Sequence, residues 1–149
     1  MEQRLSQQQL IQMAQQEENV LAEKKAMLAQ MYEIMKDSRS AIDSLKEIQA
    51  GAGKVLLRLG GGVLVEAEIK NNKTCKKSIS EDGYAETDIP YALNWLEERL
   101  KTLEGNANRV REDAIKSEGR IEEIVTVLKQ IENAKKSMMS DMNKNISTK

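Results

Sequence analysis

Apolar residues recur every seven positions along the first third of the chain, in a stretch that contains neither glycine nor proline. Two stripes, three or four positions apart, consist of Leu21, Leu28, Met35 and Ile42 and of Leu10, Met31 and Leu45. Glu17, Lys24 and Ser38 interrupt the second stripe. A seven-residue apolar repeat is typical of helices that pair along a narrow seam. The pattern therefore predicts a helix over residues 1–49 that packs against a partner helix.

The same repeat returns in the last third of the chain. Thr87 or Asp88 is suited to cap a helix there, with Pro90 in the first turn, where its missing N–H group costs little. The two stripes consist of Leu93, Leu100, Ala107, Ala114, Ile121 and Leu128 and of Leu96, Leu103, Val110, Ile124 and Ile131, with Ser117 as the polar exception. We expect a second helix over residues 88–146, supercoiled left-handedly around its partner.

Residues 50–87 combine turn residues with short stretches of strand character. The apolar runs 55–59 and 63–69 flank three consecutive glycines, Gly60-Gly61-Gly62, and predict a β-hairpin. Because an isolated hairpin is marginally stable in water, we expect this one to assemble with copies or relatives of itself. The residues expected at that contact are Val55, Leu57, Leu59, Val63, Val65, Ala67 and Ile69.

A second, less apolar hairpin is predicted over residues 74–86, with its turn at Glu81-Asp82-Gly83. Its first strand carries Lys76, Lys77 and Ser78, so we expect it at an exposed position or edge. The single cysteine, Cys75, precedes the two lysines, whose charge would lower the pKa of its thiol. We interpret this lone thiol as a bystander rather than a nucleophile.

The connection between the helices, nearly forty residues long, turns the chain back on itself and makes the two helices antiparallel. Matching the seams pairs Leu45 with Leu93 and Leu96, and Leu10 with Ile131. The predicted fold class is α+β, mainly α: a long antiparallel two-helix coiled coil with two β-hairpins at its base. The 149 residues are expected to form a single domain, divided into a helix (1–49), a double hairpin (50–87) and a helix (88–146).

Composition and charge narrow the classes of function. The net charge is −1, from 23 basic and 24 acidic residues, so no overall field attracts nucleic acid or an anionic membrane. No apolar run approaches the roughly 18 residues that suggest a membrane span, and the polar start of the chain lacks the core of a secretion signal. A single cysteine fits a reducing compartment, so we expect a cytoplasmic protein.

Candidate catalytic chemistry is sparse. The sequence contains no histidine, which excludes imidazole acid–base catalysis, Ser-His triads and the common zinc sites. The run Gly51-Ala52-Gly53-Lys54 is similar to part of a phosphate loop, but Ile48 and Val55 stand where that motif needs a glycine and a Ser or Thr. A helix-to-strand turn explains it. We therefore expect no enzymatic activity, cofactor or metal.

Apolar side chains gather at the two helix ends that the antiparallel arrangement brings together. They are Leu5, Leu10, Ile11 and Met13 near one end and Met138, Met139, Met142 and Ile146 near the other. Methionine is flexible and polarizable, so such a surface adapts to many apolar partners. Leu10, Met138 and Met142 also fit a plain continuation of the seam, whereas Leu5, Ile11 and Met139 fall outside both stripes and are better candidates for exposed contacts.

The two helices around a double hairpin closely resemble the archaeal-type alpha class of prefoldin. The resemblance is carried by the run VLLRLGGGVLVEAEI at residues 55–69, by GYAE at 83–86 and by the helix start at 88–100. It implies a hexamer in which two alpha and four beta subunits join through their hairpins into a β-barrel platform. It further implies an ATP-independent chaperone whose coiled-coil tips capture unfolded client proteins and pass them to a group II chaperonin.

Two other readings of the same features stay open. The first is a structural coiled-coil scaffold or filament-forming protein that assembles through its hairpins. The second is membrane attachment through the C-terminal segment, which carries both lysines and methionines. Suppression of aggregation of a denatured protein distinguishes a chaperone from the scaffold, and sedimentation with anionic liposomes tests the membrane reading.

Overall fold

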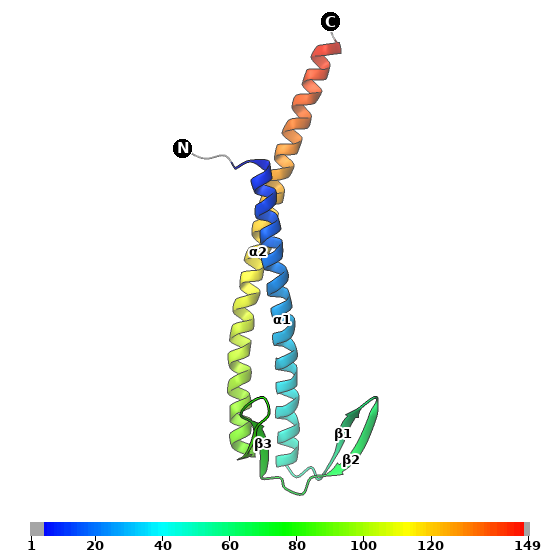
Figure 1. Cartoon of the computed structure of the whole chain (residues 1–149), viewed down its shortest axis with the longest axis vertical. Coiled ribbons are helices and arrows are strands. Elements are labelled where there is room, and N and C mark those ends of the chain that lie inside the picture. Colours follow the sequence, from blue (N-terminus) through cyan, green and yellow to red (C-terminus); the bar gives the residue numbers. More distant parts are fainter. Residues whose placement is uncertain (1–4, 148–149) are drawn as a thin grey trace. The chain divides into compact units, whose positions relative to one another are not determined.

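The computed structural model describes residues 5–147 and contains two helices and four strands over that range. In chain order they are α1 (Gln7–Gln49), β1 (Lys54–Gly60), β2 (Val63–Glu68), β3 (Thr74–Ser78), β4 (Tyr84–Asp88) and α2 (Ile89–Ser147) (Figure 1). The predicted fold class, two long helices with two small antiparallel hairpins, is confirmed. Residues 1–4, which the predicted first helix included, lie outside the described residues.

Both ends of α1 are closed by local hydrogen bonds. At the start, the Gln9 N–H donates to Ser6 Oγ at 3.2 Å and the Ser6 N–H donates to Gln9 Oε1 at 2.8 Å, which is a capping box. At the other end, Gly51 has a φ of 104°, and the Ala52 N–H donates to the Glu47 carbonyl at 3.0 Å. This reversal, which favours glycine, satisfies a carbonyl of the last turn and stops the helix.

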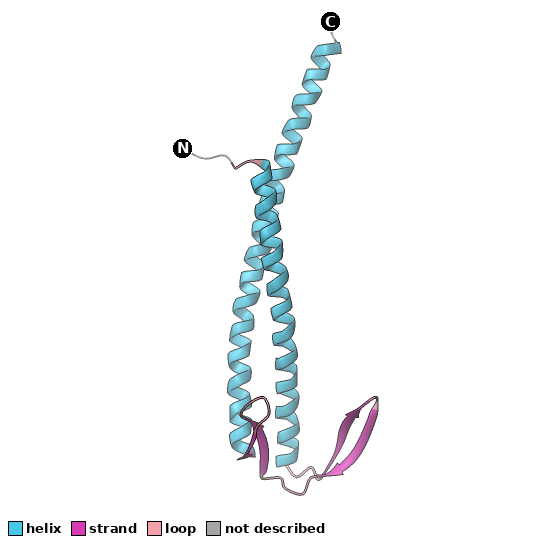
Figure 2. Cartoon of the chain, in the orientation of Figure 1, coloured by secondary structure: helices cyan, strands magenta, loops and turns pink. Residues whose placement is uncertain are grey.

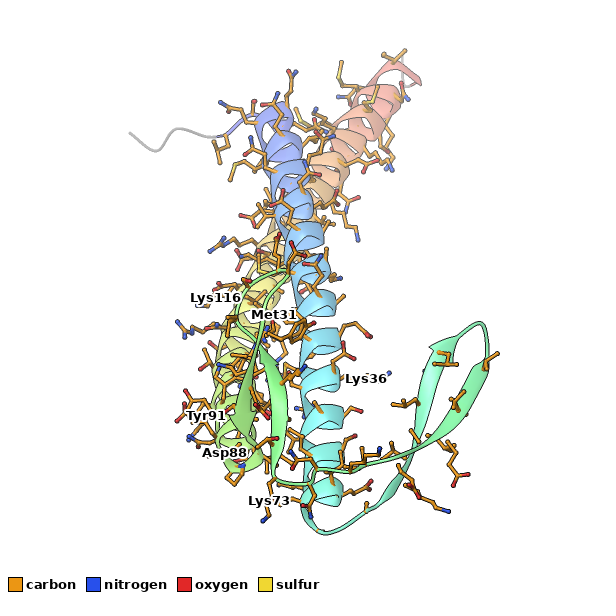
Figure 3. The ribbon with its side chains drawn as sticks, turned by 60° about the horizontal axis from the view of Figure 1, so that its bottom comes forward. Met31, Lys36, Lys73, Asp88, Tyr91 and Lys116 are labelled. Atoms are coloured by element: carbon orange, nitrogen blue, oxygen red, sulfur yellow. The ribbon has the colours of Figure 1, made fainter. Side chains whose placement is uncertain are left out.

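The first turn of α2 is capped by Asp88, which decides between the two predicted caps. Asp88 Oδ1 accepts a hydrogen bond of 2.8 Å from the Tyr91 N–H, and Figure 3 shows both residues at the base of this helix. Pro90 is the second helical residue, so its missing N–H group leaves no intrahelical bond unmade. Because Asp88 also ends β4, the second hairpin runs directly into α2.

The described chain divides into two compact units, and both helices contribute to each of them. One unit combines α1 up to Ala29 with α2 from Asn108, and the other is Gln30–Ala107. Within each unit the two helices run antiparallel along a buried seam. Its buried apolar residues are Leu10, Ala114 and Ile124 in the first unit, and Met35, Ile42, Leu93 and Ala107 in the second, all at predicted seam positions.

Ion pairs on the flank of the seam confirm its predicted register. In three of them an α1 cation meets an α2 glutamate, and a step of seven or fourteen residues back along α1 is matched by an equal step forward along α2. In a fourth, Arg120 of α2 lies 3.2 Å from Glu17 of α1. The N–O distances are 3.5 Å for Lys46–Glu97, 3.0 Å for Arg39–Glu104 and 3.4 Å for Lys25–Glu118. These side chains are about half exposed, so the pairs contribute more to alignment than to stability.

The two hairpins are separate two-stranded antiparallel sheets (Figure 2). In the first, β1 pairs with β2 through partners such as Leu57 and Val65. Gly60, Gly61 and Gly62 all have positive φ values, of 97°, 58° and 81°, which explains why three glycines occupy this turn. In the second, β3 pairs with β4 and the turn between them is closed by the Ile79 N–H, which donates to the Gly83 carbonyl at 2.9 Å.

The second hairpin is a separate two-stranded sheet, so its first strand lies at an edge, as predicted, but one face of it packs against the helices and is not exposed. The partly buried Cys75 contacts a buried cluster of Ile42, Ile89 and Leu93. On the same face, Lys77 is half-buried, with its ammonium 4.2 Å from the centre of the Trp95 ring. An ammonium group over the face of a tryptophan is attracted by the ring, and the apolar stem of the lysine can then lie along the neighbouring apolar surface. The polar sequence of β3 is therefore not sufficient to predict which of its faces is exposed.

Two serines occupy buried positions in the seams, and they differ in whether the hydroxyl group has a hydrogen-bond partner. In one unit, Ser38 Oγ donates to the Ile34 carbonyl at 2.8 Å. In the other, Ser117 is fully buried and its Oγ has no hydrogen-bond partner among the described residues. A buried polar atom without a partner costs roughly 1–3 kcal/mol relative to solvation by water.

We expect Ser117→Ala to raise the free energy of unfolding, because it removes an unsatisfied hydroxyl and adds helix propensity. Ser38→Ala is the matched control: it adds the same propensity but removes a hydroxyl that is bonded. The two variants should differ by about 1 kcal/mol, measured by urea unfolding with circular dichroism at one protein concentration. Equal changes would contradict the assignment of Ser117 as a destabilising position.

Candidate functional site

The β1–β2 hairpin presents apolar side chains on both faces, and we call its predicted contact residues the hairpin surface: Val55, Leu57, Leu59, Val63, Val65, Ala67 and Ile69. Cross-strand pairing brings Val55 beside Ala67 and Leu57 beside Val65 on one face. Leu59 lies at the irregularity that precedes Gly60. The exposures of Leu57, Leu59, Val63 and Val65 range from 43% to 65%, whereas Val55, Ala67 and Ile69 are half-buried.

The opposite face of this hairpin is also apolar in part. Leu56 is 69% exposed and Leu64 is 54% exposed. Exposed apolar residues on both faces and unpaired backbone groups along both edges are features of strands that pair with another chain. The most apolar segment of the chain is thus among its most exposed, which is the reverse of what a monomeric core would produce.

The residues predicted at the helix ends lie in the unit formed by the start of α1 and the end of α2. The Lys135 ammonium donates to Gln7 Oε1 at 2.7 Å, which brings the first residue of α1 beside Lys135 of α2. From this point α2 continues to Ser147, beyond the first residue of α1 (Figure 1). We call residues 136–147 the overhang.

The eight predicted end residues fall into three groups. Leu10 is only 8% exposed and packs in the seam, so it offers no open contact within this unit. Leu5, which precedes α1, and Ile11 and Met13, on its first turns, have exposures between 41% and 49%. The most exposed group, at 64–72%, consists of the overhang residues Met138, Met139, Met142 and Ile146. Of the three residues that fit a continued seam, therefore, only Leu10 is buried.

A shallow hollow between β3 and the helices, which sequence reasoning missed, is lined by apolar atoms of Leu45, Cys75, Trp95 and Leu96. Trp95 lies outside the seam of α2, next to the stripe that contains Leu96, with Lys77 on its ring and the Arg99 guanidinium 5.4 Å from its centre. A lone tryptophan next to seam residues was the available signal, since such a ring needs cover that a two-helix seam does not supply.

The thiol of Cys75 has a pKa that differs in direction from the prediction. Burial raises this pKa, and the nearby carboxylate of Asp88 raises it further. Successive residues of a strand point to opposite faces, so Lys76 is directed away from the thiol, and Lys77 interacts with Trp95. The prediction that the two lysines lower the pKa is therefore wrong.

Residues 5–147 contain neither of two further features. No group of three or more Cys, Asp or Glu side chains converges there in a way that could hold a metal ion. No helix in that range is both long enough and apolar enough to cross a membrane.

Comparisons with known proteins agree on one family. A family model described as "Prefoldin subunit" matches residues 13–144. Over 105 residues, the chain is 27% identical to a protein named prefoldin subunit alpha from Methanospirillum hungatei JF-1, covering 70% of each chain. It is also similar in fold to the filamentous PFD from Methanocaldococcus jannaschii, solved by cryo-EM, with a TM-score of 0.63. That likeness covers 77% of this chain and 97% of the other at 18% identity.

The raised pKa of Cys75 predicts slow alkylation by iodoacetamide, which reacts with the thiolate. The rate should rise at higher pH in the folded chain than in the urea-unfolded chain. Because the folded state holds this proton more tightly, the associated stability is complete below the unfolded-state pKa and is lost as pH rises through the folded-state pKa.

Asp88→Asn is the informative variant, since asparagine also caps helices well. It should move the pH profile of alkylation part of the way back toward that of the unfolded chain. A profile in the native protein that lies at lower pH than in urea would contradict the assignment.

Proposed function

The chain belongs to the prefoldin family, with its resemblance to the alpha class confirmed, and from this premise we propose an ATP-independent chaperone that captures unfolded polypeptides at its helix ends. Prefoldin subunits are chaperone components that assemble with other prefoldin subunits. The proposal concerns the finer steps: where clients bind, which subunits join, and where the clients go. It includes no catalytic step.

The single observation that carries the capture step is the overhang. Four large apolar side chains are each at least 64% exposed on one short helical segment, and contiguous exposed apolar surface is typical of interaction sites. Three of the four are methionines, whose flexible thioethers adapt to apolar partners of many shapes. Leu5, Ile11 and Met13 add exposed apolar area near the start of α1. We propose that these seven residues contact the client.

The hairpin surface is the proposed site of assembly. Its exposed strands favour a partner that supplies both apolar cover and backbone hydrogen bonds. We propose beta-class prefoldin subunits as that partner, in a hexamer of two alpha and four beta subunits. We further propose a cytoplasmic complex that passes its clients to a group II chaperonin and binds neither nucleic acid nor membranes. The single-domain organisation expected from the sequence is part of this proposal.

A second candidate function is a scaffold or filament built through the same hairpins. Two observations favour it: both faces of β1–β2 carry exposed apolar residues, and the fold is similar to that of a filamentous PFD. A filament would need a repeating head-to-tail contact rather than a closed ring. Native mass spectrometry of the chain alone, and with a beta-class subunit, separates an open series of masses from one closed hexamer.

Replacing all four overhang residues by glutamine should abolish most client holding. Met138→Gln, Met139→Gln, Met142→Gln and Ile146→Gln keep good helix propensity but remove the apolar surface. We expect at least a roughly tenfold rise in the amount of chaperone needed to suppress aggregation of denatured citrate synthase. Met27→Gln, an exposed methionine outside the overhang, is the control and should behave as wild type. An unchanged four-residue variant would refute the capture site.

Replacing a cross-strand pair of the hairpin surface should weaken assembly and leave the helices folded. Leu57→Thr with Val65→Thr places strand-favouring residues at both paired positions while removing apolar area. We expect loss of the oligomer at low micromolar concentration in native mass spectrometry after co-expression with a beta-class subunit. Ile115→Thr with Val127→Thr, on exposed positions of α2, is the control. If both double variants assemble alike, the hairpin surface is not the contact.

A further inference from the structure

Among the described residues, α2 continues beyond the start of α1, and the overhang lies in that continuation. The capping box of Ser6 and Gln9 ends α1 at its N-terminal side, and the Lys135–Gln7 hydrogen bond marks the level at which this occurs. Beyond Lys135, α2 continues for about three turns, or roughly 18 Å. The four large apolar side chains of that segment are 64–72% exposed.

The apolar residues of the overhang continue the seven-residue spacing of the seam residues of α2. Ile124 and Ile131 are seam residues of α2, and a further step of seven residues reaches Met138. In the same way Leu128, through Lys135, leads to Met142. Met139 and Ile146, themselves seven residues apart, lie immediately to one side of this line. The surface that packs against α1 further back therefore extends, uncovered, along the overhang.

The backbone of a helix interior limits what can bind there. Except for the carbonyls of the last turn, the N–H and C=O groups of the overhang are bonded within the helix, so an extended peptide cannot add along it as a strand adds to a sheet edge. What a helix offers is ridges and grooves of side chains, and these complement the ridges of another helix. The seam immediately before the overhang already accepts a helix, α1, in that manner.

We propose that the overhang binds an amphipathic helical segment of the client, with apolar residues spaced three and four apart, in line with α1. The client segment thus continues the coiled coil past the point where α1 begins. The methionines allow this surface to accept apolar stripes of different composition, because their side chains repack around each partner. This inference rests on the proposed capture of clients at the overhang, and it specifies the conformation in which the client is held.

A matched pair of peptides tests the proposal with the full-length chain. Both are fluorescein-labelled amphipathic peptides of about 14 residues, or four turns, with leucines at three- and four-residue spacing. One is held helical by a side-chain staple, and the other has the same composition with two central prolines that prevent a helix. Fluorescence anisotropy measures binding to the wild type, to the four-residue glutamine variant and to Met27→Gln.

The stapled peptide should bind wild type and Met27→Gln at least about tenfold more tightly than the proline peptide, a difference of about 1.4 kcal/mol. The four-residue variant should lose this preference. Equal affinity of wild type for both peptides would overturn the helical mode, as would equal loss in Met27→Gln. Concentration-dependent self-association that disappears in the four-residue variant would assign the overhang to a second copy of the chain instead.

Aggregation assays with the same proteins separate this inference from the function on which it rests. If wild type suppresses aggregation but does not prefer the helical peptide, client capture stands and the helical mode is refuted. If wild type neither suppresses aggregation nor binds either peptide, both are refuted.

Discussion

Burial of the seven-residue apolar repeat on α1 and α2 is the interaction on which the other features of this chain depend. Neither helix has an apolar face broad enough for a conventional globular core, and long helices gain most of their stability from packing rather than from propensity. Within each unit the seam supplies that packing. It also commits the seam residues of both helices to each other, which leaves the β1–β2 hairpin and the overhang to make contacts elsewhere.

The seam was predictable because apolar residues recur every seven positions, and a few polar residues at seam positions do not hide that repeat. Ser117 and Ser38 are polar, yet both are buried where the repeat puts them, and the ion pairs follow the same step. The second hairpin was not predictable in this way. Its packing depends on the meeting of Lys77 with Trp95, two residues far apart in sequence, so the local polarity of β3 gave the opposite expectation.

The pKa of Cys75 illustrates the same limit. Its neighbours in sequence are lysines, but the strand directs Lys76 to the other face, and the groups that act on the thiol are the buried cluster and Asp88. The overhang was predictable in part. Seam spacing alone could not say whether Met138 and Met142 are covered, because that depends on where α1 starts. The Ser6-Gln7-Gln8-Gln9 run carries the spacing of a capping box, and it was the readable signal for that start.

The docking of the β3–β4 hairpin resolves an ambiguity inherent in any seven-residue repeat. Two helices with this period could slide past each other by one full repeat and still bury apolar residues against apolar residues. In one such slipped state Arg39 would meet Glu97, an equally acceptable ion pair. The hairpin disfavours the slipped registers. Cys75 packs beside Ile42 of α1 and Ile89 of α2, which a slipped register would separate. In addition, β4 is joined to α2 without a linker, so the hairpin cannot follow α1 independently of α2. A small, mostly polar hairpin thereby selects one register for two much longer helices.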